Sequence, residues 1–254
     1  MTYFYLTLLI FSFLFGICIG SFLNVCIYRI PNKIKVYDGY SFCPSCHNRL
    51  KAYDLIPVIG YLILNRKCRY CGCKISPVYP IVELSAGLLF AFAFYLYGVC
   101  FNTLIVWTLI SVLIVASFMD IKSLEIPDGV SLWIAALGVV SFFIPGLLWH
   151  ERVLGIFAAS LPLFIILLLT KGGAMGMGDI KFMAAAGLLL GYKLILLSLF
   201  SSAIFGSIIG IFLIASKKKG RKDPIPFVPM LSLGILFSLF FGNSVITWYI
   251  SLLR

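Results

Sequence analysis

Long apolar segments recur along nearly the whole chain of 254 residues, and they constrain the fold more than any other feature. A bilayer core about 30 Å thick requires roughly 20 apolar residues for each helical span. Charged residues make up 11% of the sequence, whereas soluble domains carry about a quarter. The sequence therefore predicts an all-α integral membrane protein, because a helix satisfies its own backbone hydrogen bonds in lipid.

About eight transmembrane helices fit this pattern. The first is long for a signal peptide and lacks a basic start, so we interpret it as a retained span. The predicted spans are Tyr3–Tyr28, Ile81–Tyr97, Leu104–Met119, Gly129–Phe143, Val153–Thr170, Phe182–Leu190, Leu194–Ala215 and Val228–Leu252.

The basic residues orient these spans. With both chain ends outside, all Lys and Arg residues except Arg152, Lys193 and Arg254 fall on the cytoplasmic side, including a cluster at Lys217–Lys222. This asymmetry follows the positive-inside rule. Contact with anionic lipid headgroups accounts for the net charge of +11, so we expect a lipid bilayer and no nucleic acid as partner.

One long polar segment interrupts the spans. It divides the chain into a first transmembrane helix at 1–29, a cytoplasmic cysteine-rich loop at 30–80 and a helical membrane domain at 81–254. We expect the loop to fold as a small subdomain.

Two Cys-x-x-Cys pairs lie in this loop, Cys43 with Cys46 and Cys68 with Cys71. Four thiolates suit tetrahedral Zn²⁺, and each pair can present two of them to one ion. The metal would supply much of the folding energy of so small a loop. Disulfides are the alternative, which a reducing cytoplasm disfavours. Cys73 is a spare thiol that could exchange as a ligand, and His47 is a weaker substitute.

Three aspartates fall at the predicted cytoplasmic border of the membrane, where an ionisable residue indicates function. Asp120 ends the third span, Asp128 follows in Ile-Pro-Asp, and Asp179 lies in Gly176-Met-Gly178-Asp179. Asp120 and Asp179 could form an aspartyl pair, in which one acts as general base on a water and the other, held neutral by its charged neighbour, polarises the carbonyl. The alternative for each aspartate alone is a helix cap or an ion pair with a neighbouring lysine.

In these motifs the chain resembles the bacterial type IV prepilin peptidases, or leader peptidase/N-methyltransferases, an intramembrane aspartyl protease family with a G-x-G-D motif. The resemblance covers nearly the whole chain. Its motifs, in order, are Gly20-Ser-Phe-Leu-Asn24 to Pro31, the two cysteine pairs, Tyr79-Pro80-Ile-Val-Glu83, Asp120 to Asp128, Gly176 to Lys181, and Ile225-Pro226-Phe227.

The resemblance implies cleavage of the leader of a prepilin or pseudopilin, at the cytoplasmic face of the bacterial inner membrane, by a multi-pass peptidase domain. It also implies methylation of the new N-terminus with S-adenosylmethionine. The implied site residues are Asp120 and Asp179 as the catalytic pair, Asp128, Gly176, Gly178 and Lys181 in supporting roles, and Lys67 and Glu83 in methyl transfer.

One departure bears on the second activity. Arg66 stands where similar proteins often have glycine before the basic residue and the third cysteine. A peptidase without methyltransferase activity is therefore one alternative. An ion-coupled transporter is another, although it would favour acidic residues near mid-membrane and a repeated architecture. A presenilin-like protease and a non-catalytic scaffold rank lower. The sequence leaves the oligomeric state open.

Overall fold

A computed structural model describes residues 2–37, 39–144, 146–172, 175–217, 220 and 223–253. Within these residues the regular structure is helical, with two isolated β-bridges and no strand. Most of the predicted basic cluster, Lys218, Lys219, Arg221 and Lys222, lies outside them. The α-helices are α1 (Thr2–Arg29), α2 (Ile59–Ile63), α3 (Val78–Tyr97), α4 (Phe101–Ser123), α5 (Asp128–Val140), α6 (Trp149–Leu169), α7 (Met177–Ala215) and α8 (Val228–Leu252), and the 3-10 helices are η1 (Ala52–Leu55) and η2 (Ser141–Phe143).

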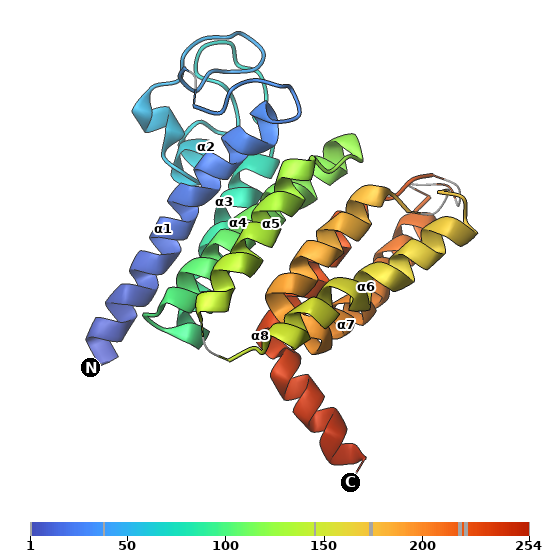
Figure 1. Ribbon diagram of the computed structural model, residues 1–254. Coiled ribbons are helices and arrows are strands. Elements are labelled where there is room, and N and C mark those ends of the chain that lie inside the picture. The colour runs from blue at the N-terminus through green and yellow to red at the C-terminus, as the bar shows by residue number, and fades with distance from the viewer. Residues whose placement is uncertain are drawn as a thin grey trace. The chain divides into compact units, whose positions relative to one another are not determined.

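The chain divides into two compact units, Met1–Val115 and Ala116–Arg254, and α4 contributes to both. In the first unit α1 packs along α3, and the cysteine loop covers the end of this pair opposite to the N-terminus (Figure 1). A Cβ atom added at Gly20 would lie 2.7 Å from the Cα atom of Glu83. Glycine is thus what allows the two helices to approach to backbone contact.

In the second unit α7 packs against α5, α6 and α8 (Figure 1). The closest approach joins α6 and α7, where an added Cβ atom at Gly187 would lie 2.0 Å from the carbonyl oxygen of Gly155. Gly191 interrupts the helical dihedral angles of α7, with φ 75° and ψ 170°. Only glycine adopts such a conformation readily, so this residue divides α7 into two arms.

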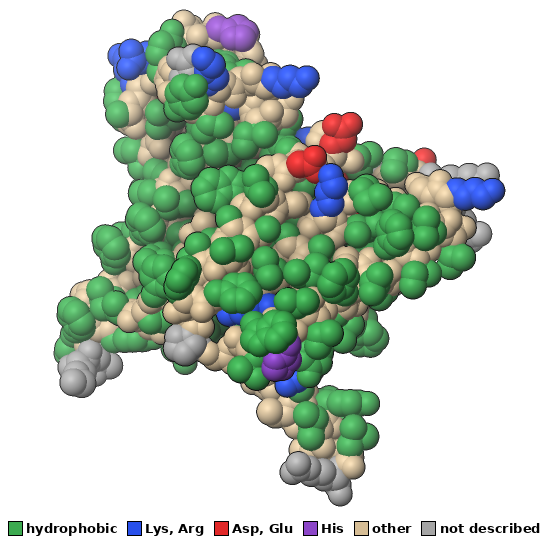
Figure 2. Space-filling model, viewed as in Figure 1, with side chains coloured by type: hydrophobic (Ala, Val, Ile, Leu, Met, Phe, Trp, Pro, Cys, Tyr) green, Lys and Arg blue, Asp and Glu red, His purple; other side chains and the backbone are tan. Residues whose placement is uncertain are grey.

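Among the described residues, six helices are long and apolar enough to cross a membrane: α1, α3, α4, α6, α7 and α8. This confirms a multi-pass membrane protein, and hydrophobic side chains cover the helical surface in each unit (Figure 2). The predicted spans Phe182–Leu190 and Leu194–Ala215 are the two arms of α7, and Gly129–Phe143 corresponds to the short α5 with η2. All eight predicted segments are therefore helical, while the number of spans stays a prediction.

Candidate active site and metal centre

The two cysteine pairs adopt the same local structure. In each, the first cysteine carbonyl accepts a hydrogen bond from the residue four positions later, His47 or Gly72, at 2.8 and 2.9 Å. Both of these residues have positive φ, 57° and 71°. A β-bridge closes each turn, between Phe42 and Arg49 in the first and between Lys67 and Lys74 in the second. Each turn therefore presents its two thiols in the same direction, as a metal ion shared by the two turns requires.

The four predicted thiols, of Cys43, Cys46, Cys68 and Cys71, lie within 4.8 Å of one another. Tetrahedral coordination with Zn–S bonds of about 2.3 Å separates the sulfurs by about 3.8 Å. The Cys43 and Cys71 sulfurs are 3.9 Å apart, so this donor set fits a tetrahedral metal ion. All eight cysteines are free thiols, and Cys73 brings a fifth sulfur within 3.6 Å of Cys43. His47 instead stacks on the Phe42 ring.

Electrostatics favour a thiolate at Cys43 of this centre, whereas at Cys71 the backbone N–H of Cys73 is outweighed by hydrogen bonds with the neighbouring thiols, which raise the pKa. Burial by itself raises the pKa of the Cys43 thiol, but hydrogen bonds from the backbone N–H groups of Cys46 and Ser45 and from the Cys73 and Cys68 thiols outweigh it. The net effect lowers the pKa of Cys43 to about 6. Since metals bind the thiolate, this position is prepared for a metal ion at neutral pH.

Arg29 anchors the cysteine loop to the end of α1, a role that its place in the sequence did not reveal. Arg29 is 5% exposed, and its guanidinium donates to the carbonyl oxygens of Lys35, Val36 and Tyr40 at 3.0 to 3.2 Å. From the position of Arg29 at the end of the first span, the sequence predicts only a basic residue at the cytoplasmic border of the membrane. The three acceptors are backbone groups, which leave no signature in side-chain identity.

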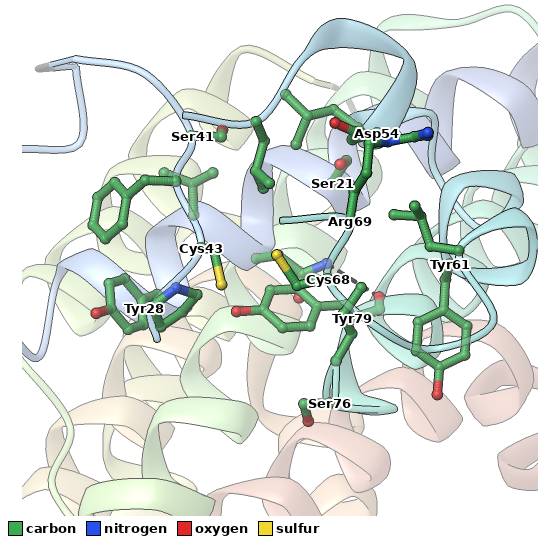
Figure 3. A pocket seen from close by; sticks show the side chains of 18 of the residues that line it. Ser21, Tyr28, Ser41, Cys43, Asp54, Tyr61, Cys68, Arg69, Ser76 and Tyr79 are labelled. Atoms are coloured by element: carbon green, nitrogen blue, oxygen red, sulfur yellow. Dashed lines mark hydrogen bonds and ion pairs between the residues drawn. The ribbon is translucent and has the colours of Figure 1, made fainter. Parts of the chain in front are cut away.

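A cavity of about 340 Å³ lies in the first unit, between the cysteine loop and the adjoining ends of α1 and α3 (Figure 3). Glu83 lines it and is 7% exposed. Its carboxylate accepts a hydrogen bond from the backbone N–H of Val58 at 2.7 Å, rather than pairing with a basic loop residue. Lys67, the other residue predicted for methyl transfer, is exposed and does not line the cavity.

Asp120 lies near the C-terminal end of α4 and is 5% exposed. Its Oδ2 atom accepts a hydrogen bond from the backbone N–H of Val228 at 2.9 Å, and Phe227 offers a second N–H. The first N–H groups of a helix have no partner within the helix and favour a negative charge. The N-terminus of α8 therefore holds the carboxyl of Asp120 in place, which explains the position of the Pro226-Phe227 motif.

Asp179 lies in the first turn of α7, where its carboxyl accepts a hydrogen bond from the backbone N–H of Gly176. The carboxyls of Asp179 and Asp120 are close enough to interact electrostatically. The structure thus brings the two predicted catalytic aspartates together at helix ends in one unit. An added Cβ atom at Gly178 would lie 3.3 Å from the Ile126 side chain, while Gly176 is open.

Asp128 begins α5 and has a different partner from the one expected of a helix cap. Its carboxylate forms an ion pair with the Nζ atom of Lys181 at 2.7 Å. This pair connects the first turns of α5 and α7, and both side chains are well exposed, at 79% and 51%. It therefore brings two of the predicted supporting residues into contact beside Asp179.

These features define a class: multi-pass helical membrane proteins with two neighbouring aspartates at helix ends and, in a polar loop, four cysteines whose arrangement fits a metal ion. Residues 14–97 match the family model described as the bacterial peptidase A24 N-terminal domain. Residues 107–211 match the type IV leader peptidase family.

Three similar proteins carry the name prepilin leader peptidase/N-methyltransferase. The protein from Bacillus subtilis (strain 168) is 32% identical, covering 94% of this chain and 97% of its own length. The protein from Aeromonas salmonicida (strain A449) is 32% identical, and the match covers 94% of this chain and 92% of the relative. The protein from Legionella pneumophila is 31% identical, and the match covers 93% of this chain and 92% of the relative. No solved structure matches the chain. The chain belongs to the type IV leader peptidase family.

Proposed function

We propose that this chain cleaves the leader peptide of type IV prepilins or pseudopilins and methylates the N-terminus that cleavage exposes. The observation that carries the first activity is the pairing of Asp120 and Asp179, which come from different helices and interact through their carboxyls. The printed names of the relatives support both activities together.

Cleavage would use the two aspartates as a general base and a general acid. One carboxylate removes a proton from a water molecule, which attacks the scissile carbonyl. The other carboxyl polarises that carbonyl by donating its proton to the carbonyl oxygen. The N–H of Val228 holds the Asp120 carboxyl so that it keeps its orientation as charge develops. A pair at helix ends suits hydrolysis better than ion transport, which would favour carboxylates near mid-membrane.

The supporting residues would shape the substrate's approach. The ion pair between Asp128 and Lys181 ties the beginning of α5 to that of α7, next to Asp179. A Cβ atom added at Gly176 would have no neighbouring atom nearer than 3.9 Å. This glycine therefore leaves room for an extended peptide beside the catalytic pair. Gly178 allows Ile126 to pack closely against the same turn.

The cysteine loop would hold one structural Zn²⁺ through Cys43, Cys46, Cys68 and Cys71, whose geometry supports this ion. We further propose eight spans, counting α5 and each arm of α7 separately, with the loop and the aspartates facing the cytoplasm of a bacterial inner membrane. The exposed basic side chains of the loop favour that orientation. In this arrangement residues 1–29, 30–80 and 81–254 serve as first helix, cysteine-rich loop and peptidase domain.

Methyl transfer would take its methyl group from S-adenosylmethionine, with Glu83 and Lys67 as the residues proposed to take part. S-adenosylmethionine supplies an electrophilic methyl group on a positively charged sulfur. The α-amino nitrogen of the new N-terminus would accept it. A peptidase without this second activity is the alternative, because Arg66 replaces the glycine common in similar proteins.

The test is cleavage of a candidate prepilin in membranes by the wild type and by Asp120→Asn and Asp179→Asn, with mass spectrometry of the new N-terminus. Loss of general acid–base catalysis predicts a decrease of about 10²- to 10⁴-fold in each variant. Asp223→Asn is the matched control, since this exposed aspartate only caps a local turn at Gly220.

Full cleavage by either Asp120→Asn or Asp179→Asn would exclude the aspartyl mechanism. Absence of cleavage by the wild type would favour a transporter or a scaffold. A product that carries one added methyl group supports the second activity. A cleaved but unmethylated product, with S-adenosylmethionine present, would leave a peptidase alone.

A further inference from the structure

The two predicted catalytic aspartates are supported by different arms of α7. Asp179 lies on the first arm, in the first turn of the helix and twelve residues before the break at Gly191. This arm packs closely against α5 and α6 (Figure 1). A Cβ atom added at Gly138 of α5 would lie 2.8 Å from the Leu188 side chain, and Gly187 meets the backbone of α6. The position of Asp179 therefore depends on the orientation of the first arm.

Asp120 is tied to the second arm through α8. The backbone N–H of Val228 donates to its carboxyl at 2.9 Å, which links the end of α4 to the beginning of α8. The α8 helix in turn packs on the second arm, where a Cβ atom added at Gly234 would overlap the carbonyl oxygen of Ser198. The support of Asp120 therefore follows the second arm, whereas Asp179 follows the first.

The break between the arms is held by α6 and by the turn that precedes it. Gly191 has φ 75° and ψ 170°, a region open essentially to glycine alone. A Cβ atom added at Gly155 of α6 would lie 2.9 Å from the carbonyl carbon of Gly191, and one added at Gly191 would lie 2.9 Å from the Leu147 side chain. Lys193, two residues beyond the break, forms an ion pair with Glu151 of α6 at 3.5 Å. These contacts fix the angle between the two arms.

The length of the first arm makes the pair sensitive to this angle. Twelve residues of helix separate Asp179 from Gly191, which corresponds to about 18 Å. A rotation of about 5° at Gly191 would therefore move Asp179 by about 1.5 Å. A displacement of about 1 Å can lower the rate of an enzyme about 10²-fold. A small change at the break is thus large for the catalytic pair.

We propose that Gly191 is a positioning residue for the proposed cleavage: the break that it makes in α7 sets the separation of the carboxyls of Asp120 and Asp179. An unbroken α7 would direct its first arm, and Asp179 with it, away from the place beside Asp120. The contacts of α6 at the break keep the angle at its catalytic value. The inference rests on the proposed peptidase activity and adds to it a residue about 18 Å from the reacting groups.

The first measurement is the cleavage of the candidate prepilin by Gly191→Ala in lipid nanodiscs. Alanine does not readily adopt the dihedral angles of Gly191, and its Cβ atom would meet Leu147, so the break must change. We expect kcat per folded enzyme to fall by about 10- to 100-fold and KM to change by less than about threefold, because the pair is misplaced while substrate still binds. Gly210→Ala on the same helix is the matched control and should keep the wild-type kcat and KM, since its added Cβ atom has no neighbour nearer than 4.0 Å.

The second measurement is a distance across the break. Spin labels are introduced through an unnatural amino acid, because the chain holds eight native cysteines. One pair of labels replaces Met177 and Leu233, exposed residues on the first arm and on α8, and pulsed electron paramagnetic resonance measures their separation. Gly191→Ala should change this separation by at least about 1.5 Å. Labels at Leu196 and Leu233, on the second arm and α8, should keep the wild-type distance.

Thermal unfolding reports whether each variant is folded, and if Gly191→Ala fails that check, Leu147→Ala decides. This substitution keeps the glycine and removes the side chain that packs against it. The distribution of distances between positions 177 and 233 should then broaden, and kcat should fall. Leu148→Ala changes the neighbouring leucine, which is more exposed, and should behave as the wild type does.

Wild-type kcat in folded Gly191→Ala would overturn the inference, and so would an unchanged separation of the labels at positions 177 and 233. A raised KM with unchanged kcat would also overturn it, because Gly191 would then act on substrate binding. Equal shifts in both pairs of labels would place the change outside the break and count against it as well. A wild type that cleaves no prepilin overturns the proposed function and the catalytic role of Gly191 together, and the distances then show separately whether the break sets the position of the first arm.

Discussion

The contact between α6 and α7 leads to a sharp prediction for Gly187→Ala. The added Cβ atom would meet the carbonyl oxygen of Gly155 at 2.0 Å and its carbonyl carbon at 2.5 Å. Ordinary contacts of a Cβ atom begin at 3.4 Å, so the backbones must separate by about 1.4 Å. Both partners are backbone atoms, and no rotamer change can relieve the clash.

Overpacking of this kind costs about 1–3 kcal/mol, and we take the upper end because backbone meets backbone. The higher helix propensity of alanine returns up to about 1 kcal/mol. The expected net loss of about 2 kcal/mol lowers the melting temperature by about 4–8 °C for a chain of this size. Gly187 lies eight residues, or about 12 Å, along α7 from Asp179. A 1 Å displacement of a catalytic group can lower activity about 10²-fold, so cleavage should fall as well.

Gly210→Ala on the same helix is the control, since its added Cβ atom has no neighbour nearer than 4.0 Å. Thermal unfolding in detergent and prepilin cleavage are measured for both variants and the wild type. Gly210→Ala should match or slightly exceed the wild type in stability. If Gly187→Ala melts and cleaves like Gly210→Ala, the close packing of α6 on α7 does not control the position of Asp179, and the reasoning is refuted.

Four further predictions concern the cysteine loop and the ion pair. Elemental analysis should find one zinc ion per chain in Cys73→Ser and none in Cys43→Ser. Equal loss of zinc in both variants would show that Cys73 is a ligand. The fold lowers the pKa of the metal-free Cys43 thiol to about 6, and a bound metal ion competes with protons for the same sulfur. Zinc should therefore be retained at pH 7 and released only as the pH falls below about 6. Arg29→Met leaves three loop carbonyl oxygens without their hydrogen-bond donor. This change should lower the free energy of unfolding by about 1–3 kcal/mol and speed amide hydrogen exchange in the loop. Unchanged protection of the loop amides would contradict the anchoring role of Arg29. Breaking the exposed ion pair of Asp128 with Lys181 should change the free energy of unfolding by less than about 1 kcal/mol, and a clearly larger loss in chemical denaturation would show that the pair is structural.

Several features follow from the sequence alone because their physical causes are local. Long apolar runs must form helices in lipid, and every predicted span is helical in the structure. The Cys-x-x-Cys spacing sets the turn that brings each pair of thiols together, so the four-cysteine group was predicted correctly. The aspartates were identifiable because acidic residues are few and fall beside apolar runs.

Tertiary structure decided the features that join distant segments. The sequence placed Asp120 at a helix end, but only the fold brings the N–H of Val228 to its carboxyl. It also pairs Asp128 with Lys181 rather than leaving it as a helix cap, and it directs Glu83 into the cavity beneath the cysteine loop.

The number of helices shows the same division. The pattern of apolar runs separated two segments on either side of Gly191, whereas the structure joins them as two arms of α7 through the positive φ of that glycine. Composition determines whether a segment is helical in a membrane, because each helix satisfies its own backbone there. Which helices touch depends on small residues and single hydrogen bonds between distant parts of the chain, as Gly155 with Gly187 illustrates, and only the folded chain brings those together.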